Sequence, residues 1–430
     1  MNRIIQILLY LLTSSFLWSQ SGFFEKDFLR NQDFIYQPNI RSVLIYKMGF
    51  EMSAPIIALH SDERLMLSFD DLSEDYTKYE YTLIHCDADW NNSDLQPNEY
   101  LETFTNDFIQ TFDYSVNTMQ DYVHYRQIIP NDVIQIKLSG NYIVKVYPAG
   151  QPDKPSFTRR FFVMDNKSNV LATVKRSNMV SERDFRHELK FAVNLTDIFI
   201  TDPQKEIKVT IRQNGRWDNA ITNLKPWELR NGQLLFNDIG SYVFDAGNDF
   251  RYFDLKSLKY NSMRVRAIEY DPGQGYQVFL HDDEVRKKYL YTRIQESMNG
   301  RFLIKTEDYP NSDTESEYSM VNFFLSYPSP LTDGKLYLMG GLTYWQFLRE
   351  NELTYNHERR GFEASILLKQ GFYNYQYIFL PNNAQVGDIS FIEGNFYETN
   401  NEYTFYVYYR PLGSRYDQLI NVTLVLAHPN

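Results

Sequence analysis

The chain has 430 residues, enough for about three domains of about 150 residues each. Its net charge of −12 gives an acidic surface that repels phosphate backbones, which argues against nucleic-acid binding. Aromatic residues make up 16% of the chain, and Tyr and Phe favour half-buried pleated strands, so the composition predicts a β-rich fold. A single cysteine, Cys86, excludes a disulfide framework within the chain.

The first 20 residues have the layout of a secretory signal peptide. A short basic start at residues 1–3 precedes an apolar run at residues 4–12, which closes at the polar residues 13–15. The run is shorter than the span of about 20 residues that a membrane helix needs, which disfavours the alternative of a retained anchor. We therefore expect residues 1–20 to be removed, and the mature protein to be exported and soluble, without a membrane span.

Short β-prone runs between turn-forming residues follow along the rest of the chain. In the first unit, residues 21–166, the expected strands are 41–46, 65–69, 79–85, 141–147 and 161–164. In the second unit, residues 167–310, they are 188–194, 206–212, 233–236, 263–270, 277–280 and 301–305. In the third unit, residues 311–430, they are 320–325, 335–339, 362–368, 373–379, 403–409 and 419–427.

Two polar, turn-rich segments, residues 165–169 and 309–317, supply the boundaries between these units. Residues 284–297 fit a helix or a loop equally well. Runs of four to eight residues separated by turns are typical of sandwiches. The pattern therefore predicts an all-β chain of three immunoglobulin-like β-sandwich domains in series.

The densest polar cluster in the sequence lies at residues 85–94. A nucleophile activated by His85 is disfavoured for Cys86, because adjacent residues on a strand point to opposite faces. Asp87, Asp89 and Asn91 match the first ligand positions of a calcium loop, but the Gly and Glu that such a loop needs later are missing. A looser calcium site stays open beside the simpler interpretation, in which these side chains cap turns at a strand end and Cys86 is buried.

Motifs of known enzyme classes are absent from the sequence. It contains no phosphate-binding glycine loop, no H-E-x-x-H and no G-x-S-x-G, and its seven histidines have no zinc-like spacing. We therefore expect no catalytic, cofactor-binding or metal-binding residues, no cofactor, and no enzymatic activity.

Aromatic residues in the third unit suggest one alternative function. A strand at residues 335–339, a Gly turn and Trp345, followed by the aromatic strand with Tyr373 and Tyr375, resemble immunoglobulin-like carbohydrate-binding modules. Exposed aromatic rings there would stack on sugars, whereas the simpler interpretation places them in a sandwich core. A carbohydrate-binding accessory protein is the alternative hypothesis.

An ordered series of segments in the first unit resembles one specific family, the plug proteins of the type IX secretion system. The segments are 41–46, 55–59, 65–72, 79–90, 99–101, 114–118, 138–142 and 158–161. Residues 251–256, 394–399 and 408–411 extend the resemblance over most of the mature chain. One departure is Thr103-Phe104, where the family pattern has a Gly before the Phe; it concerns a local loop.

The resemblance implies a periplasmic protein at the inner face of the outer membrane. Its partner would be the giant outer-membrane β-barrel translocon of the type IX secretion system, whose periplasmic opening it would bind and seal when no cargo is engaged. Catalytic residues, a small-molecule substrate and nucleic acid play no part in that role.

Overall fold

The computed structural model describes residues 29–427 apart from residues 74, 197, 237–239 and 295. In this part, strands joined by turns dominate, and the helices that it contains are three or four residues long. The prediction of an all-β chain is confirmed. The predicted signal peptide, residues 1–20, lies outside the described residues.

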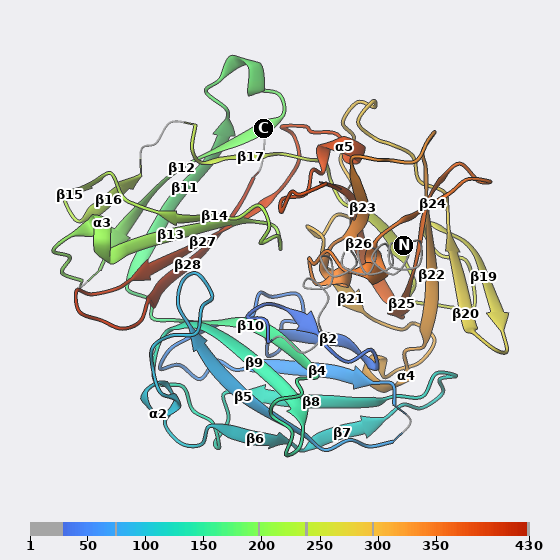
Figure 1. The fold of residues 1–430 in the computed structure, drawn as a ribbon, viewed down its shortest axis with the longest axis horizontal. Helices are drawn as coiled ribbons and strands as arrows, with labels where there is room; N and C mark the ends of the chain where they lie inside the picture. Colours follow the sequence, from blue (N-terminus) through green and yellow to red (C-terminus); the bar gives the residue numbers. More distant parts are fainter. Residues whose placement is uncertain (1–28, 74, 197, 237–239, 295, 428–430) are drawn as a thin grey trace, which may run out of the picture.

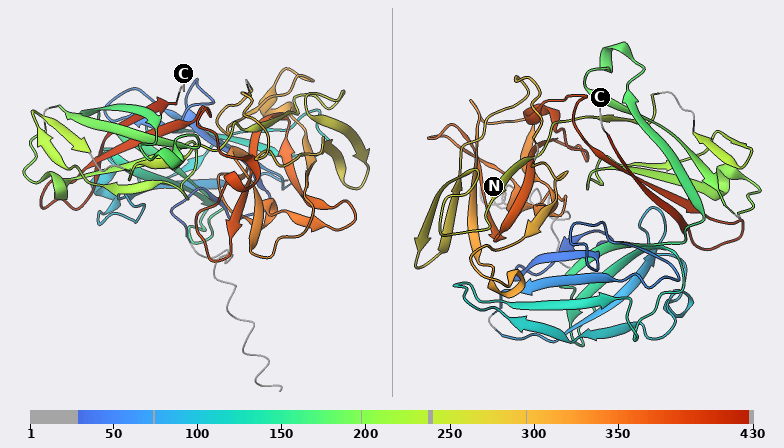
Figure 2. Two further views of the ribbon diagram at one scale, coloured as in Figure 1. Left: turned by 90° about the horizontal axis from the view of Figure 1, so that it is seen from above. Right: turned by 180° about the vertical axis from the view of Figure 1, so that it is seen from behind.

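Six sheets pack in pairs into three sandwiches, which lie around a common centre like the corners of a triangle (Figure 1). Each sandwich has its own cluster of buried apolar side chains. Seen from the edge, the three sandwiches form a single flat layer (Figure 2). Every sandwich therefore contacts the other two.

The first sandwich holds the N-terminal part of the described chain. One sheet has the order β1-β10-β9-β5-β6 with β3 beside β10, and the other has the order β2-β4-β8-β7. In β5 (Tyr79–Cys86) every second side chain is buried, because one face of the strand lies on the core. The other strands are β1 (Phe34–Ile35), β2 (Ile40–Lys47), β3 (Ile56–Ala58), β4 (Leu65–Asp71), β6 (Asn106–Ile109), β7 (Thr111–Tyr114), β8 (Val123–Ile129), β9 (Gly140–Pro148) and β10 (Phe157–Met164), with helix α2 (Pro97–Tyr100) after β5.

The second sandwich is built from two distant stretches of the chain. Its sheets have the orders β11-β12-β16-β15, with β17 beside β12, and β14-β13-β27-β28. The first stretch supplies β11 (Ser168–Arg176), β12 (Arg186–Leu195), β13 (Ile207–Gln213), β14 (Ile221–Leu224), β15 (Glu228–Arg230), β16 (Gln233–Phe236) and β17 (Val243–Asp245), with short helices η1 (Val180–Glu182) and α3 (Pro203–Glu206). The second stretch supplies β27 (Glu402–Tyr409) and β28 (Gln418–Leu426).

The third sandwich lies between those two stretches in the sequence. Its sheets have the orders β18-β26-β21, with β23 beside β26, and β19-β20-β22-β25-β24. Its strands are β18 (Arg251–Asp254), β19 (Val265–Asp271), β20 (Gly275–Leu280), β21 (Phe302–Ile304), β22 (Tyr318–Ser326), β23 (Gly334–Met339), β24 (Thr354–Asn356), β25 (Gly361–Lys369) and β26 (Gly371–Pro381). Helices α4 (Ser312–Glu315), η2 (Gly341–Thr343), η3 (Arg349–Asn351) and α5 (Ser390–Glu393) connect them.

This topology corrects the predicted boundary between the second and third units. Strands β18 to β21 pair with β22 and β26 and so belong to the third sandwich, although they precede residue 311. Strand β27 pairs with the whole length of β13 of the second sandwich, although it lies near the C-terminus. The third sandwich is therefore an insertion in the second. Sequence pattern shows where strands lie, but long-range pairing decides which strands share a sheet.

Candidate functional site

The polar cluster at residues 85–94 forms a strand end, with its side chains pointing to different sides. Cys86 is fully buried and has no disulfide, as predicted, and burial raises the pKa of its thiol to about 12. His85 packs against Tyr142 and Tyr100, while Cys86 belongs to a separate apolar cluster, so the two side chains do not form a nucleophile and its base.

Asp87 organises the loop that follows this strand. Its Oδ1 accepts hydrogen bonds from the backbone N–H groups of Asp89 and Asn91, both at 2.9 Å. Asp89 in turn accepts a hydrogen bond from the side-chain amide of Asn223 in the second sandwich. In the described part of the chain, no three His, Cys, Asp or Glu side chains are grouped closely enough to hold a metal ion. The residues of the suggested calcium loop thus cap a turn and join two sandwiches.

The aromatic residues of the third sandwich lie in two different environments. Tyr373 and Tyr375 are buried in its core, stacked on or against Phe253. Trp345 instead lies between sandwiches: its ring packs against Phe250, and the positions that Cβ atoms would take on Gly215 and Gly300 fall within 2.3 Å of it. The core position expected for Trp345 is wrong: its ring lies against Gly215 of the second sandwich and Gly300 of the third, after a left-handed turn at Tyr344 and Trp345.

A buried ion-pair cluster joins the first sandwich to the third. Asp70, in β4, accepts from Lys369 Nζ and His124 Nδ1, both at 2.6 Å, and its side chain is fully buried. Tyr318, from β22, donates to the same carboxylate at 2.7 Å. Burial opposes ionisation of Asp70, but the charges of Lys369 and His124 outweigh it and lower the pKa of the carboxyl group. Asp70 is therefore the centre of the contact between these two sandwiches.

The contact between the first and second sandwiches is mainly aromatic. In β27 alternate residues Tyr403, Phe405 and Val407 face the core of the second sandwich. Tyr406 and Tyr408 face the opposite way, into a cluster with Cys86, Trp90 and Phe162 of the first sandwich. Tyr408 also donates to Asn141 at 2.9 Å. Because β27 is buried on both faces, one strand contributes to a core and to a joint.

The backbone passes between the second and third sandwiches twice, from β17 to β18 and from α5 to β27. These two segments are the backbone crossings. They lie side by side: Phe396 N donates to the Gly247 carbonyl oxygen at 2.8 Å, and Asn401 Nδ2 donates to the Ala246 carbonyl oxygen at 2.7 Å. Nearby, Arg301 of the third sandwich binds both carboxylate oxygens of Glu402 of the second, at 2.7 and 2.6 Å.

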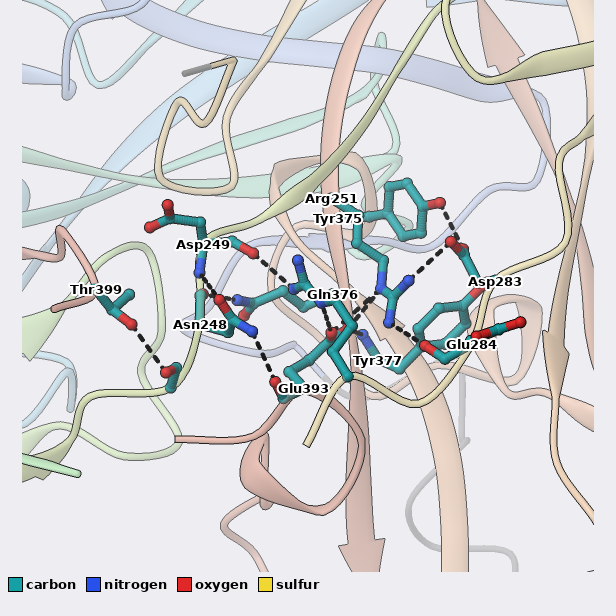
Figure 3. A network of polar contacts seen from close by, with 12 residues as sticks. Asn248, Asp249, Arg251, Asp283, Glu284, Tyr375, Gln376, Tyr377, Glu393 and Thr399 are labelled. Carbon is teal, nitrogen blue, oxygen red and sulfur yellow. Dashed lines mark hydrogen bonds and ion pairs between the residues drawn. The ribbon is translucent and has the colours of Figure 1, made fainter. Parts of the chain in front are cut away.

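Behind these crossings, a network of charged residues stabilises the interior of the third sandwich (Figure 3). Arg251 lies between two carboxylates, with Nη1 at 2.8 Å from Asp283 and Nε at 3.0 Å from Glu393. The hydroxyl groups of Tyr375 and Tyr377 both donate to Asp283, at 2.7 and 2.9 Å. Burial opposes ionisation of Glu393, yet Arg251 and Arg286 lower its pKa. The network is thereby both paired and hydrogen-bonded, as buried charges require.

None of these joints was visible in the sequence. Asp70 and Lys369 are 299 positions apart, and an isolated buried lysine has no sequence signature. One indirect signal was available: the acidic pair Asp70-Asp71 directly follows the strand predicted at residues 65–69, and both aspartates are buried within β4. Together the joints make three sandwiches into one body.

Comparison with known proteins assigns the chain to a family. The family model described as type 9 secretion system plug protein, first domain, matches residues 40–165, which correspond to the first sandwich. A crystal structure of a hypothetical protein from Parabacteroides merdae is 38% identical, with a TM-score of 0.89, and covers 93% of this chain and 100% of its own. No curated protein matches. Within the described residues, none of the helices has the length and apolarity to cross a membrane. The chain belongs to the type 9 (IX) secretion system plug protein family.

Proposed function

We propose that this protein is a periplasmic plug, which binds and seals the periplasmic opening of the outer-membrane β-barrel translocon of the type IX secretion system. The observation that carries the proposal is the match of the first sandwich to the first domain of the plug protein family. In this role the protein acts by binding alone, without catalysis and without a cofactor.

The construction of the molecule supports a role as a stopper. A pore wide enough for folded cargo is closed only by a large body that does not deform. Three sandwiches in one flat layer, joined by the Asp70 cluster, the aromatic contact of β27 and two backbone crossings, meet that need (Figure 2). The loops at the sandwich ends remain free to contact a rim.

The alternative of a carbohydrate-binding protein receives little support from the aromatic residues that suggested it. Tyr373 and Tyr375 are 1% and 0% exposed and have no access to a sugar. Trp345 is partly buried between the second and third sandwiches, where Gly215 and Gly300 press against its indole ring. Retardation of the protein by α-glucans in an affinity gel, abolished by Trp345→Ala, would restore this alternative.

The decisive experiment compares single and double deletions in cells. Deleting this protein alone should make the outer membrane permeable to bulky antibiotics and dyes, because the barrel then stays open. Deleting the barrel as well should restore the barrier, because no pore remains. General damage to the envelope would persist in the double deletion, so that outcome would contradict the proposal.

Physical association needs a separate measurement. Gentle extraction of outer membranes, followed by affinity purification of the tagged plug, should recover a very large barrel identified by mass. Failure to recover the barrel, together with an intact barrier in the single deletion, would overturn the proposed function.

A further inference from the structure

A crevice opens at the centre of the molecule, where all three sandwiches meet. Its volume is about 210 Å³. The first sandwich contributes Arg159 and Arg160 to its wall, the second contributes Arg212, and the third contributes Arg301 and Tyr344. The crevice thus gathers four arginines in a chain whose net charge is −12.

The acidic residues at the crevice neutralise these arginines only in part. Three carboxylates line it: Asp33, Glu51 and Glu402. Glu402 pairs with Arg301, and Asp33 accepts a hydrogen bond from the backbone N–H of Arg160 at 2.7 Å. Burial lowers the pKa of Arg159 and Arg160, and the negative charge of Asp33 opposes that effect for both. Glu51 is exposed to solvent. The wall therefore keeps an excess of positive charge.

Arg159 is the residue with the most unused binding capacity. It is 3% exposed, and its Nη1 donates to the carbonyl oxygen of Thr158 at 2.9 Å. Its buried Nε and Nη2 have no hydrogen-bond partner among the residues that the structure describes. The guanidinium group lies against the ring of Tyr344, 3.9 Å from its centre, which fixes its plane. A buried charge with free donors is unfavourable unless a counter-charge or water satisfies it.

Arg160 and Arg212 extend this positive surface along the crevice. The guanidinium of Arg160 lies between Trp90 and Trp217, at 4.2 and 4.8 Å from the ring centres, and its Nε and Nη2 both donate to the Asn31 carbonyl oxygen. Arg212 lies 4.9 Å from the centre of the Trp217 ring, and its buried Nε has no partner in the described part of the chain. Arg159 and Arg212 therefore keep buried donors without a partner among the described residues, whereas Nε and Nη2 of Arg160 are both used.

We propose that this crevice is an oxyanion-binding site, in which a carboxylate or phosphate group accepts hydrogen bonds from the free donors of Arg159, with Arg212 adding positive charge from the second sandwich. The planar guanidinium fork matches the two oxygens of a carboxylate or phosphate. The site is independent of the proposed binding to a barrel. Because its walls come from all three sandwiches, an anion bound there stabilises their contact.

The test is a titration of the mature, full-length protein with inorganic phosphate, acetate, phenylacetate and chloride at constant ionic strength. Isothermal calorimetry and thermal unfolding should show binding and stabilisation by phosphate or a carboxylate that chloride does not reproduce. Preference for phosphate indicates a free inorganic anion as the ligand, and preference for phenylacetate indicates an organic carboxylate. If all four anions act alike, the crevice holds only water and the proposal is wrong.

Two variants of Arg159 separate specific binding from general charge effects. Arg159→Met and Arg159→Lys should each weaken anion binding at least tenfold, since both remove the planar fork. Arg183→Met, at an exposed position away from the crevice, is the matched control and should bind as the natural protein does. If Arg159→Met does not fold, anion binding is measured with Arg212→Gln, which should also weaken it. Unchanged affinity in the Arg159 variants that fold would overturn the proposal.

Discussion

The third sandwich contacts its two neighbours in different ways. Its joint with the second sandwich is covalent at two adjacent crossings, so hydrogen bonds there only refine a contact that the backbone already enforces. Its joint with the first sandwich has no covalent backbone connection. It depends on the side chains around Asp70 and on hydrogen bonds between the loop at residues 115–122 and residues 313–317. A buried ion pair is a costly way to make a contact. It occurs here where the chain provides no tether, and there it fixes one orientation.

The largest effect is predicted for the joint between the first and third sandwiches, which no backbone segment connects directly. Lys369→Met leaves the Asp70 carboxylate buried without its main counter-charge, and should lower the free energy of unfolding by about 3–5 kcal/mol. Urea unfolding measures the loss, and hydrogen exchange should show faster opening around residues 70 and 124 than elsewhere. The matched double variant Asp70→Leu/Lys369→Met removes both charges and should recover much of the loss. An equal loss in the double variant would mean that packing, and not charge pairing, holds this joint.

A second prediction concerns the joint between the first and second sandwiches, whose stability should depend on pH more strongly than that of the joint at Asp70. Burial lowers the pKa of His85, which lies beside Tyr416 of the second sandwich, to about 4. In the unfolded chain His85 therefore becomes protonated below about pH 6.5, whereas in the folded protein it becomes protonated only near pH 4. Stability should be complete above pH 6.5 and fall by about 3 kcal/mol as the pH drops towards 4.

Denaturant unfolding at pH 7 and pH 4.5 checks this effect, with His85→Gln as the variant that should reduce the difference. Asp70 sharpens the comparison, because its lowered pKa keeps its ion pairs intact over the same range. Hydrogen exchange should then rise first around residue 85. Faster exchange at residue 70 in this range would reverse the order of the two joints.

The smallest predicted effect concerns the tethered joint. Arg301→Met removes the ion pair with Glu402, whose side chain is 7% exposed, while the side chain of Arg301 is 30% exposed. Because solvent screens the arginine and the backbone crossings remain, the loss should be about 1–2 kcal/mol by urea unfolding. A loss as large as that of Lys369→Met would show that the backbone crossings do not make this joint less dependent on its ion pair than the joint at Asp70.

Local pattern predicted the strands far better than their partners. Alternation identified β5 and the aromatic strand β26, because a strand with a buried face carries its signal in its own residues. The pattern missed β8, where His124, Arg126 and Gln127 interrupt the apolar residues. It also placed a linker where β11 begins at Ser168. The assignment of β27 to the third unit failed for a different reason, since pairing with β13 depends on a surface that is 190 residues away.

The joints were the least predictable part of the molecule. Trp345 was expected in a core, yet its position depends on two distant glycines that leave room for its ring. The unsatisfied donors of Arg159 likewise arise only when three sandwiches meet around it. Such features are properties of the assembled body, and no local segment contains them.

The insertion of the third sandwich into the second also orders the events of folding. During synthesis from the N-terminus, the first sandwich has all its strands once residue 164 has emerged, and the third has all of its strands once residue 381 has emerged. The second sandwich must wait for the last strands of the chain, and until then β13 presents an unpaired edge to any strand it meets. Loss of the final 30 residues would therefore leave a middle sandwich with an open, aggregation-prone edge, while its two neighbours could still complete their sheets.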